Sequence, residues 1–347
     1  MKNKLNGKMI FNILTLIIPV AFIIYFLSSE NGLMDLIENA NKFNWGWIVV
    51  AVSLQLLNVF VDSLILLNLT FNYDKKYTLI KSLKATAVGQ FFTVITPGGI
   101  GGQPMQLYCM KKQSVDTGVA SSSLVQKFLV YQTTITFYSL ISMLLNLDIF
   151  SGNMSNAMIS LAAFGFISHA LVIAFVFMFS FNKKLTSSII NACFKFLEKV
   201  KIIKNSTEKA DKIKTQLEYF YESNKQLYKN KKSLFLTCVL TISQLTFIFA
   251  IPYAVYRAFN FDGAKIFDMI TGQAFVTMVS SFMPLPGGSG AAEGSFYVFF
   301  QMFFTQNTIK SAILVWRIIT YFMNIILFAP FAKVGNVSET TKTLENI

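Results

Sequence analysis

Two stretches decide the fold of this chain: Thr96-Pro97-Gly98-Gly99-Ile100-Gly101-Gly102-Gln103-Pro104 in the first half, and Pro284-Leu285-Pro286-Gly287-Gly288-Ser289-Gly290-Ala291-Ala292-Glu293-Gly294 in the second. Both interrupt apolar sequence of the kind that crosses membranes. Helix-breaking residues are tolerated at membrane depth only where protein or a water-filled cavity satisfies the freed backbone groups. The two breaks therefore predict a lined site within the membrane, whereas an ordinary surface turn would normally be bracketed by two full spans.

The composition is that of an integral membrane protein. Of 347 residues, 54% are hydrophobic and only 14% are charged, whereas globular proteins average about 25% charged residues. The net charge of +13 comes mainly from lysines between the apolar stretches, which membrane topology explains without a nucleic-acid partner. Three cysteines without paired spacing and a single histidine, His169, suggest neither a disulfide framework nor a metal site. The glycine runs do not match a nucleotide-binding loop, and we expect no cofactor.

The apolar segments predict an all-α polytopic membrane protein. A span needs about 20 apolar residues, and six segments meet this length: 10–27, 46–69, 118–147, 157–180, 233–256 and 311–331. The first resembles a signal peptide, but no cleavage site follows it, so we interpret it as an uncleaved span. Shorter apolar pieces surround the two breaks, at 83–95 with 104–110 and at 266–283 with 291–305. These suit re-entrant helical hairpins, which enter and leave the membrane by one face. If each hairpin instead crossed twice, the chain would have ten spans, some of them too short for a bilayer.

The distribution of lysine orients these spans. Lysines at positions 2, 4 and 8 precede the first span, and the stretch 182–232 carries 13 Lys against 5 Asp or Glu, giving 13 − 5 = +8. Both regions belong in the cytoplasm by the positive-inside rule, and six crossings then place both termini there. The first hairpin would enter from the cytoplasm and the second from outside, which is the pattern of an inverted repeat. Gly89-Gln90 and Gly272-Gln273 add a faint internal echo.

These predictions divide the chain into four regions. They are a first membrane half at 1–181 with the re-entrant motif 96–104, a cytoplasmic basic loop at 182–232, a second membrane half at 233–334 with the re-entrant motif 284–294, and a cytoplasmic tail at 335–347. Apolar residues recur at helical spacing in the basic loop, which predicts two amphipathic helices on the inner membrane surface. No stretch is long enough for a soluble catalytic domain, since such domains usually have about 100–150 residues.

Two pairs of charged residues lie within the predicted spans or beside the breaks, where an ionisable group is a functional candidate. Asp62 and Lys127 both fall in the cytoplasmic half of their spans and could form a structural ion pair or contact a substrate. Glu293 follows the second glycine run, and Arg317 lies about two turns into the last span, at a depth where the two could meet. Together they would suit a zwitterionic or aminoacylated phospholipid head group, while the alternative is a salt bridge that braces the hairpin.

The same motifs resemble a known family. Thr96-Pro97-Gly98-Gly99 and the following run to Tyr108, the second glycine run with Glu293-Gly294-Ser295-Phe296, and Trp316-Arg317 with Thr320-Tyr321 are similar to the signature of the lysylphosphatidylglycerol synthase transmembrane family. This is the flippase-type membrane part of the multiple peptide resistance factor, and the likeness covers nearly the whole chain. The resemblance implies a multi-pass plasma-membrane protein that moves lysyl-phosphatidylglycerol to the outer leaflet. Such transport lowers the attraction of cationic antimicrobial peptides.

The motifs and the resemblance together give a set of candidate residues and partners. We expect the substrate to contact Thr96, Gly98, Gly99, Gly101, Gly102, Gln103, Gln106, Tyr108, Gly287, Gly288, Gly290, Glu293, Arg317 and Tyr321. The expected partners are a membrane phospholipid and a separate lipid aminoacyltransferase, and the sequence leaves a homo-oligomer open. Complete bifunctional family members carry a soluble aminoacyltransferase domain after the membrane part, which we expect this chain to lack. Two alternatives stay open: a phosphatidylglycerol lysyltransferase, as the family's name suggests, and a secondary transporter of a small solute.

Overall fold

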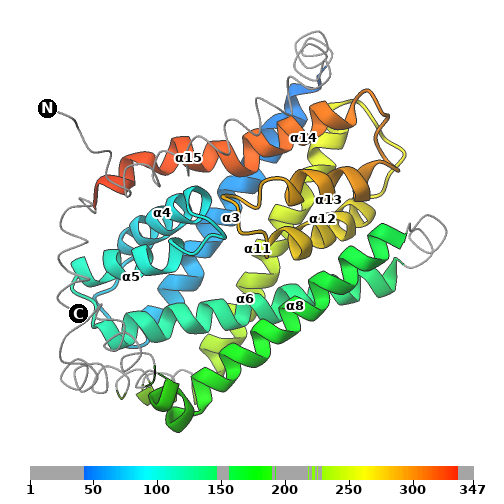
Figure 1. Cartoon of the computed structure of the whole chain (residues 1–347). Coiled ribbons are helices and arrows are strands. Elements are labelled where there is room, and N and C mark those ends of the chain that lie inside the picture. Colours follow the sequence, from blue (N-terminus) through cyan, green and yellow to red (C-terminus); the bar gives the residue numbers. More distant parts are fainter. Residues whose placement is uncertain are drawn as a thin grey trace, which may run out of the picture.

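A computed structural model describes residues 43–146, 156–189, 192, 218, 221, 222, 225 and 229–334. The regular secondary structure of these residues is helical and includes no β-strand, in agreement with the predicted all-α class (Figure 1). The predicted span 10–27, the tail 335–347 and most of the basic loop 182–232 lie outside the described residues.

Among the described residues, four helices are long and apolar enough to cross a membrane. They are α3 (Trp45–Phe71), α6 (Thr117–Leu145), α11 (Lys231–Ala258) and a segmented last helix made of α14 (Ile309–Arg317), η2 (Ile318–Phe322), α15 (Met323–Phe328) and η3 (Ala329–Val334). They correspond to the predicted spans 46–69, 118–147, 233–256 and 311–331. The predicted span 157–180 falls in α8 (Asn156–Phe181), whose apolar run Ile159–Phe175 is shorter than a full crossing by the same measure.

Each Pro-Gly-Gly break forms the turn of a helical hairpin. The first hairpin consists of α4 (Leu79–Ile95) and α5 (Gly102–Lys112), and the second of α12 (Ile266–Ser280) and α13 (Ala291–Phe300). In each turn the two glycines after the proline have φ between +60° and +68°. This left-handed conformation is nearly free of strain for glycine but costly for other residues, which explains the glycine pairs. We call these turns the first elbow (96–101) and the second elbow (281–290).

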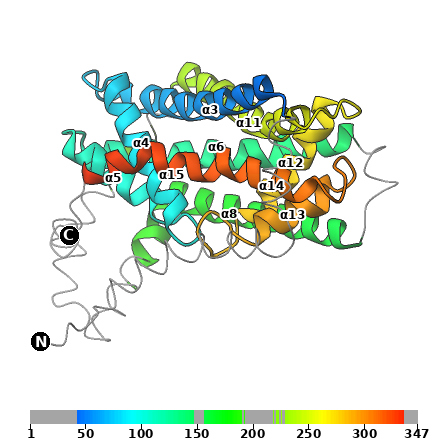
Figure 2. The same ribbon diagram turned by 90° about the horizontal axis from the view of Figure 1, so that it is seen from above.

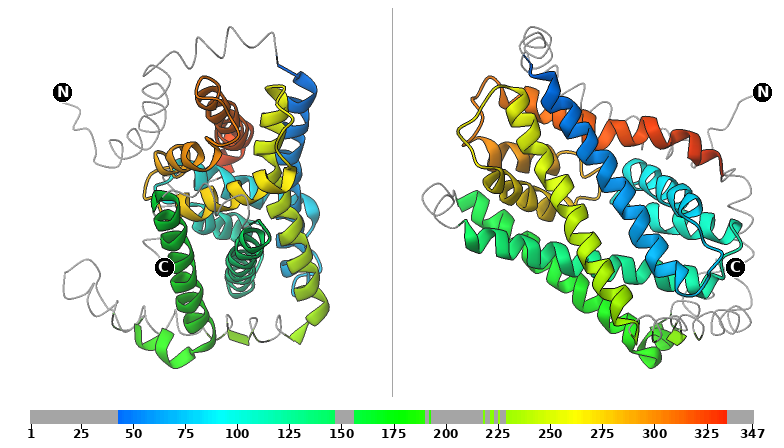
Figure 3. Two further views of the ribbon diagram at one scale, coloured as in Figure 1. Left: turned by 90° about the vertical axis from the view of Figure 1, so that its right-hand side faces the viewer. Right: turned by 180° about the vertical axis from the view of Figure 1, so that it is seen from behind.

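The helices α3 and α11 lie side by side in opposite directions (Figure 3). The Asn44 backbone N–H at the start of α3 donates to the Ala258 carbonyl at the end of α11, at 2.9 Å. At the other end of the pair, the Asn68 side chain donates to the Ser233 carbonyl, also at 2.9 Å. Each hairpin follows the C-terminal end of its helix, so the two hairpins extend from opposite ends of the pair. Their elbows meet in the middle, where Pro97 and Pro286 form an isolated antiparallel bridge (Figures 1 and 2).

The helices of the second half repeat those of the first half at a constant difference in residue number. Gly98 and Gly287 hold the same place in their elbows, and 287 − 98 = 189. Adding 189 to the bounds of α3, α5 and α6 gives 234–260, 291–301 and 306–334, which closely match α11, α13 and the segmented last helix. The Gly89-Gln90 and Gly272-Gln273 echo has a different spacing, 272 − 89 = 183, so it is out of register with this repeat.

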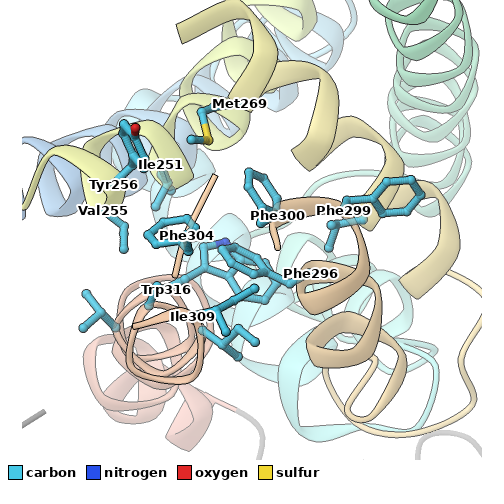
Figure 4. Close-up of a cluster of buried hydrophobic side chains, with 14 of the residues drawn as sticks. Ile251, Val255, Tyr256, Met269, Phe296, Phe299, Phe300, Phe304, Ile309 and Trp316 are labelled. Carbon is cyan, nitrogen blue, oxygen red and sulfur yellow. The ribbon is translucent and has the colours of Figure 1, made fainter. Parts of the chain in front are cut away.

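The second hairpin packs against a dense aromatic cluster (Figure 4). The Phe296 ring stacks on Phe300 with centroids 4.2 Å apart and lies 4.9 Å from the Trp316 indole. Phe299 and Phe304 complete this buried core beside α11 and α14. The first hairpin has a smaller apolar core, around Val88 and Met110, and a polar pocket lies along its other side. The two halves therefore repeat the backbone arrangement but not the chemistry.

Candidate functional site

The polar pocket beside the first hairpin has a volume of about 370 Å³. Its walls come from α3, α4, α5, α6, α11 and the segmented last helix. The polar residues that line it are Gln55, Asn58, Asp62, Gln90, Thr93, Gln103, Gln106, Lys127, Tyr131, Gln244, Thr320 and Asn324. Among the described helices of the wall, α3, α6, α11 and the last helix are apolar enough to cross a membrane. The concentration of amides and hydroxyls between them marks the pocket as a functional candidate.

The predicted pair Asp62 and Lys127 meets at the pocket wall. The Lys127 Nζ donates to Asp62 Oδ2 at 2.8 Å. Gln90 donates to the same carboxylate oxygen at 3.3 Å, and Gln244 donates to Oδ1 at 3.2 Å. Asp62 is buried, and removing a carboxylate from water is tolerated only when a partner charge and hydrogen bonds replace its hydration. Four helices contribute to this arrangement, which therefore fixes how α3, α4, α6 and α11 sit around the pocket.

Amide side chains extend the polar lining toward the last helix. Gln55 donates to Asn324 Oδ1 at 2.9 Å, and Asn58 donates to Gln55 Oε1 at 3.4 Å. Asn324 in turn donates to the Thr320 carbonyl of its own helix. Neither Asn324 nor Thr320 was among the residues expected to contact the substrate. The bond between Gln55 and Asn324 links the two halves of the chain at the pocket.

The predicted pair Glu293 and Arg317 also meets, but at the second elbow and not in the pocket. Arg317 Nε donates to Glu293 Oε1 at 2.7 Å, and Arg317 Nη1 donates to the Gly287 carbonyl at 3.0 Å. The other Glu293 oxygen accepts the Gly290 backbone N–H at 2.7 Å. Both side chains are more than nine-tenths buried. The pair thus satisfies backbone groups that the break in the helix leaves free, which is the bracing role that the sequence left as an alternative.

The aromatic residue Tyr321 completes this bracing. It lies in η2, a single π-helical turn directly after Arg317, and the Arg317 guanidinium sits 5.4 Å from the centre of its ring. A Cβ atom added to Gly287 would overlap this ring. π-Helical turns inserted in α-helices often mark functional sites, and this one brings the last helix into contact with the second elbow.

The remaining predicted residues divide between the pocket and the elbows. Gly102, Gln103 and Gln106 line the pocket. Thr96 closes the first elbow, since its hydroxyl accepts the Gly101 N–H at 2.9 Å. The elbow residues that are not part of the pocket wall are Gly98, Gly99, Gly101, Gly287, Gly288 and Gly290. Tyr108 is also outside the wall, and the Lys112 ammonium lies 5.1 Å from the centre of its ring. The site therefore centres on the helices beside the first elbow more than on the glycines themselves.

Comparison with known proteins agrees with the arrangement of motifs. The family described as "Lysylphosphatidylglycerol synthase TM region" matches residues 10–327. The chain belongs to this family. Among the proteins similar to this chain, the "UPF0104 membrane protein" of Archaeoglobus fulgidus is 25% identical over 314 residues, which cover 89% of this chain and 91% of the relative. An uncharacterized protein of Mycoplasma genitalium, MG306, is 26% identical over 341 residues, covering 90% of this chain and 84% of the relative. No solved structure matches the chain.

Proposed function

We propose that this protein is a lipid-handling membrane protein that moves the polar head group of an aminoacylated phospholipid, such as lysyl-phosphatidylglycerol, between the leaflets of the plasma membrane. The observation that carries the proposal is the polar pocket, which lies among helices long and apolar enough to cross a membrane. A polar head group loses its hydration on entering hydrocarbon, at a cost of several kcal/mol for each charged or unpaired polar group. A pocket lined by amides and hydroxyls lowers that cost along the path.

The proposal includes the arrangement in the membrane. Six spans place both termini in the cytoplasm, and the two hairpins are re-entrant and enter from opposite faces. The opposed directions of α3 and α11 support this arrangement, as does the contact between Pro97 and Pro286. The ion pair of Glu293 and Arg317 supports it further, because a broken helix needs side chains to satisfy its free backbone groups at membrane depth.

The biological consequence follows from charge. Moving lysyl-phosphatidylglycerol to the outer leaflet makes that surface less negative, and cationic antimicrobial peptides are then attracted less strongly. In this proposal a separate aminoacyltransferase supplies the lipid. The family name supports lysyl-phosphatidylglycerol as the first head group to test.

Reconstitution of the full chain in liposomes tests the proposal. Vesicles would contain a trace of lysyl-phosphatidylglycerol with a fluorescent acyl chain, and an impermeant quencher would report the label in the outer leaflet. We expect the inner-leaflet label to become quenchable much faster than in protein-free vesicles. Gln103 is exposed at the pocket, so Gln103→Trp should obstruct the pocket and slow the exchange. The matched control is Gln301→Trp, at an exposed position on the second hairpin.

Two results would contradict the proposal. One is the same exchange rate with and without protein. The other is accelerated exchange of a soluble amino acid across the vesicle membrane with no acceleration for lipid, which would favour a secondary transporter of a small solute.

A further inference from the structure

The charges of the pocket are already paired with each other. Asp62 accepts hydrogen bonds from Lys127, Gln90 and Gln244, at 2.8, 3.3 and 3.2 Å. No other acidic or basic side chain is among the residues that line the pocket in the described part of the chain. A ligand therefore meets a wall without net charge, where the polar groups still available are amides and hydroxyls.

Gln106 is the clearest unused group of that wall. It lies on α5 with only 5% of its surface exposed, and its amide sits over Gly89 of α4. Its side chain lines the pocket, and no described residue forms a hydrogen bond with it. A primary amide has two N–H donors and one oxygen acceptor, so it can donate to and accept from a polar group beside it. Gln106 is thus placed to bind a polar group that enters the pocket.

The chemistry of the wall selects among the parts of a lipid head group. An ammonium group is held best by a free carboxylate, and a phosphate by a free arginine or lysine. Neither kind of charged group is free among the described pocket residues, because Asp62 and Lys127 are paired with each other. A hydroxyl both donates and accepts a hydrogen bond, as does an amide. Phe128 and Tyr131 add aromatic surface to the same wall.

We propose that the pocket recognises the hydroxyl groups of a lipid head group, a glycerol or a sugar, and not an amino or phosphate group. This inference depends on the proposed function, since it assumes that the occupant is a lipid. It also gives lysyl-phosphatidylglycerol a specific position: the glycerol hydroxyl occupies the pocket, and the lysyl group stays outside the contacts of Gln106.

Binding can be measured separately from transport. The purified full chain in detergent would be titrated with dihexanoyl phosphatidylglycerol, lysyl-phosphatidylglycerol, phosphatidylethanolamine and phosphatidylcholine, and with a short-chain glucosyl diacylglycerol. A ligand raises the melting temperature according to its concentration and affinity for the folded state. We expect the three lipids with head-group hydroxyls to raise the melting temperature at lower concentration than the two without. If phosphatidylglycerol and the glycolipid raise the melting temperature alike, the pocket recognises the hydroxyl groups that they share. A rise confined to the phospholipids overturns the proposal.

Variants at Gln106 give the matched test. Gln106→Leu should weaken the binding of hydroxylated lipids about tenfold, which corresponds to about 1.4 kcal/mol, the size of one hydrogen bond. Gln106→Glu adds the free carboxylate that the wall lacks and should shift the preference toward lysyl-phosphatidylglycerol. Gln301→Leu is the control at an exposed position and should leave every affinity unchanged.

The outcomes separate this inference from the proposed function. Equal binding of phosphatidylcholine and phosphatidylglycerol, or binding of lysyl-phosphatidylglycerol alone, overturns hydroxyl recognition even if lipid exchange in vesicles is fast. Selective binding of hydroxylated lipids without any exchange supports hydroxyl recognition and contradicts the flippase. If Gln106→Leu loses its folded structure, the lipid preferences of the unmodified protein and of Gln106→Glu still decide the question.

Discussion

Gly98 and Gly287 offer a controlled measurement of the contact between the second elbow and the last helix. They hold equivalent places in the two elbows and share a φ of +60°. Alanine in this left-handed conformation costs about 1–2 kcal/mol. The two substitutions, Gly98→Ala and Gly287→Ala, therefore carry the same backbone penalty and differ only in what the new methyl group meets.

The surroundings of the two glycines are very different. At Gly98 the nearest atom to an added Cβ is Ile100 Cγ1 at 3.7 Å, an ordinary contact. At Gly287 the added Cβ would overlap the ring of Tyr321, which is 3% exposed and has little room to move. Overpacking of this kind costs about 1–3 kcal/mol. We expect Gly98→Ala to lower the free energy of unfolding by about 1–2 kcal/mol and Gly287→Ala by about 2–5 kcal/mol.

Equilibrium unfolding in mixed detergent micelles, followed by tryptophan fluorescence, measures both values. Gly294→Ala is the control for replacing glycine by alanine without a steric contact, because nothing lies within 4 Å of an added Cβ in that helical position. It should stabilise the protein by about 0.5–1 kcal/mol, since alanine favours a helix more than glycine does. In a Tyr321→Ala background, Gly287→Ala should cost no more than Gly98→Ala. Two results would refute the contact between Gly287 and Tyr321. One is an equal loss of unfolding free energy for Gly98→Ala and Gly287→Ala in the unmodified protein. The other is a loss for Gly287→Ala that is as large in the Tyr321→Ala background as in the unmodified protein.

Two further substitutions test the ion pairs. Glu293→Ala leaves the buried Arg317 charge without its partner and should reduce the free energy of unfolding by about 3–5 kcal/mol. The measurement uses the same micelles. A loss below about 1 kcal/mol would mean that the pair is solvated. Lys127→Met leaves Asp62 without its counter-charge at the pocket and should slow lipid exchange in vesicles at least about tenfold if one charge-assisted hydrogen bond is lost. Lys76→Met, at an exposed position, is its control, and an equal effect of both lysine variants would show that overall charge and not the pocket governs exchange.

The spans were predictable because they depend on local sequence. An apolar run of sufficient length forms a helix whose polar backbone groups bond to one another, so the predicted spans lie close to the bounds of α3, α6, α11 and the last helix. The two ion pairs were predictable for a related reason. A charged residue in an apolar span needs a partner, and few candidates were present in the sequence.

The pocket was not predictable in the same way. Gln55 and Asn324 are 269 positions apart, and only the packing of α3 against the last helix brings them within 2.9 Å. Amides are common contacts between membrane helices, so Gln55, Asn58 and Gln244 carry no signal that distinguishes a site from a packing contact. The full extent of the repeat was not predictable either, for a different reason. Its register is visible in the Pro-Gly-Gly pairs, but the surrounding side chains are polar in one half and aromatic in the other.

The sequence by itself determined which segments become helices, where the chain must turn, and which charges need partners, because hydrophobicity, glycine conformation and the cost of an unpaired charge act over short distances. Only the tertiary structure decided which helix faces meet. In the folded chain the Glu293 and Arg317 pair lies at the second elbow, and the Asp62 and Lys127 pair lies at the pocket. That division depends on the opposed directions of α3 and α11, a relation between segments almost 190 residues apart that no local pattern encodes.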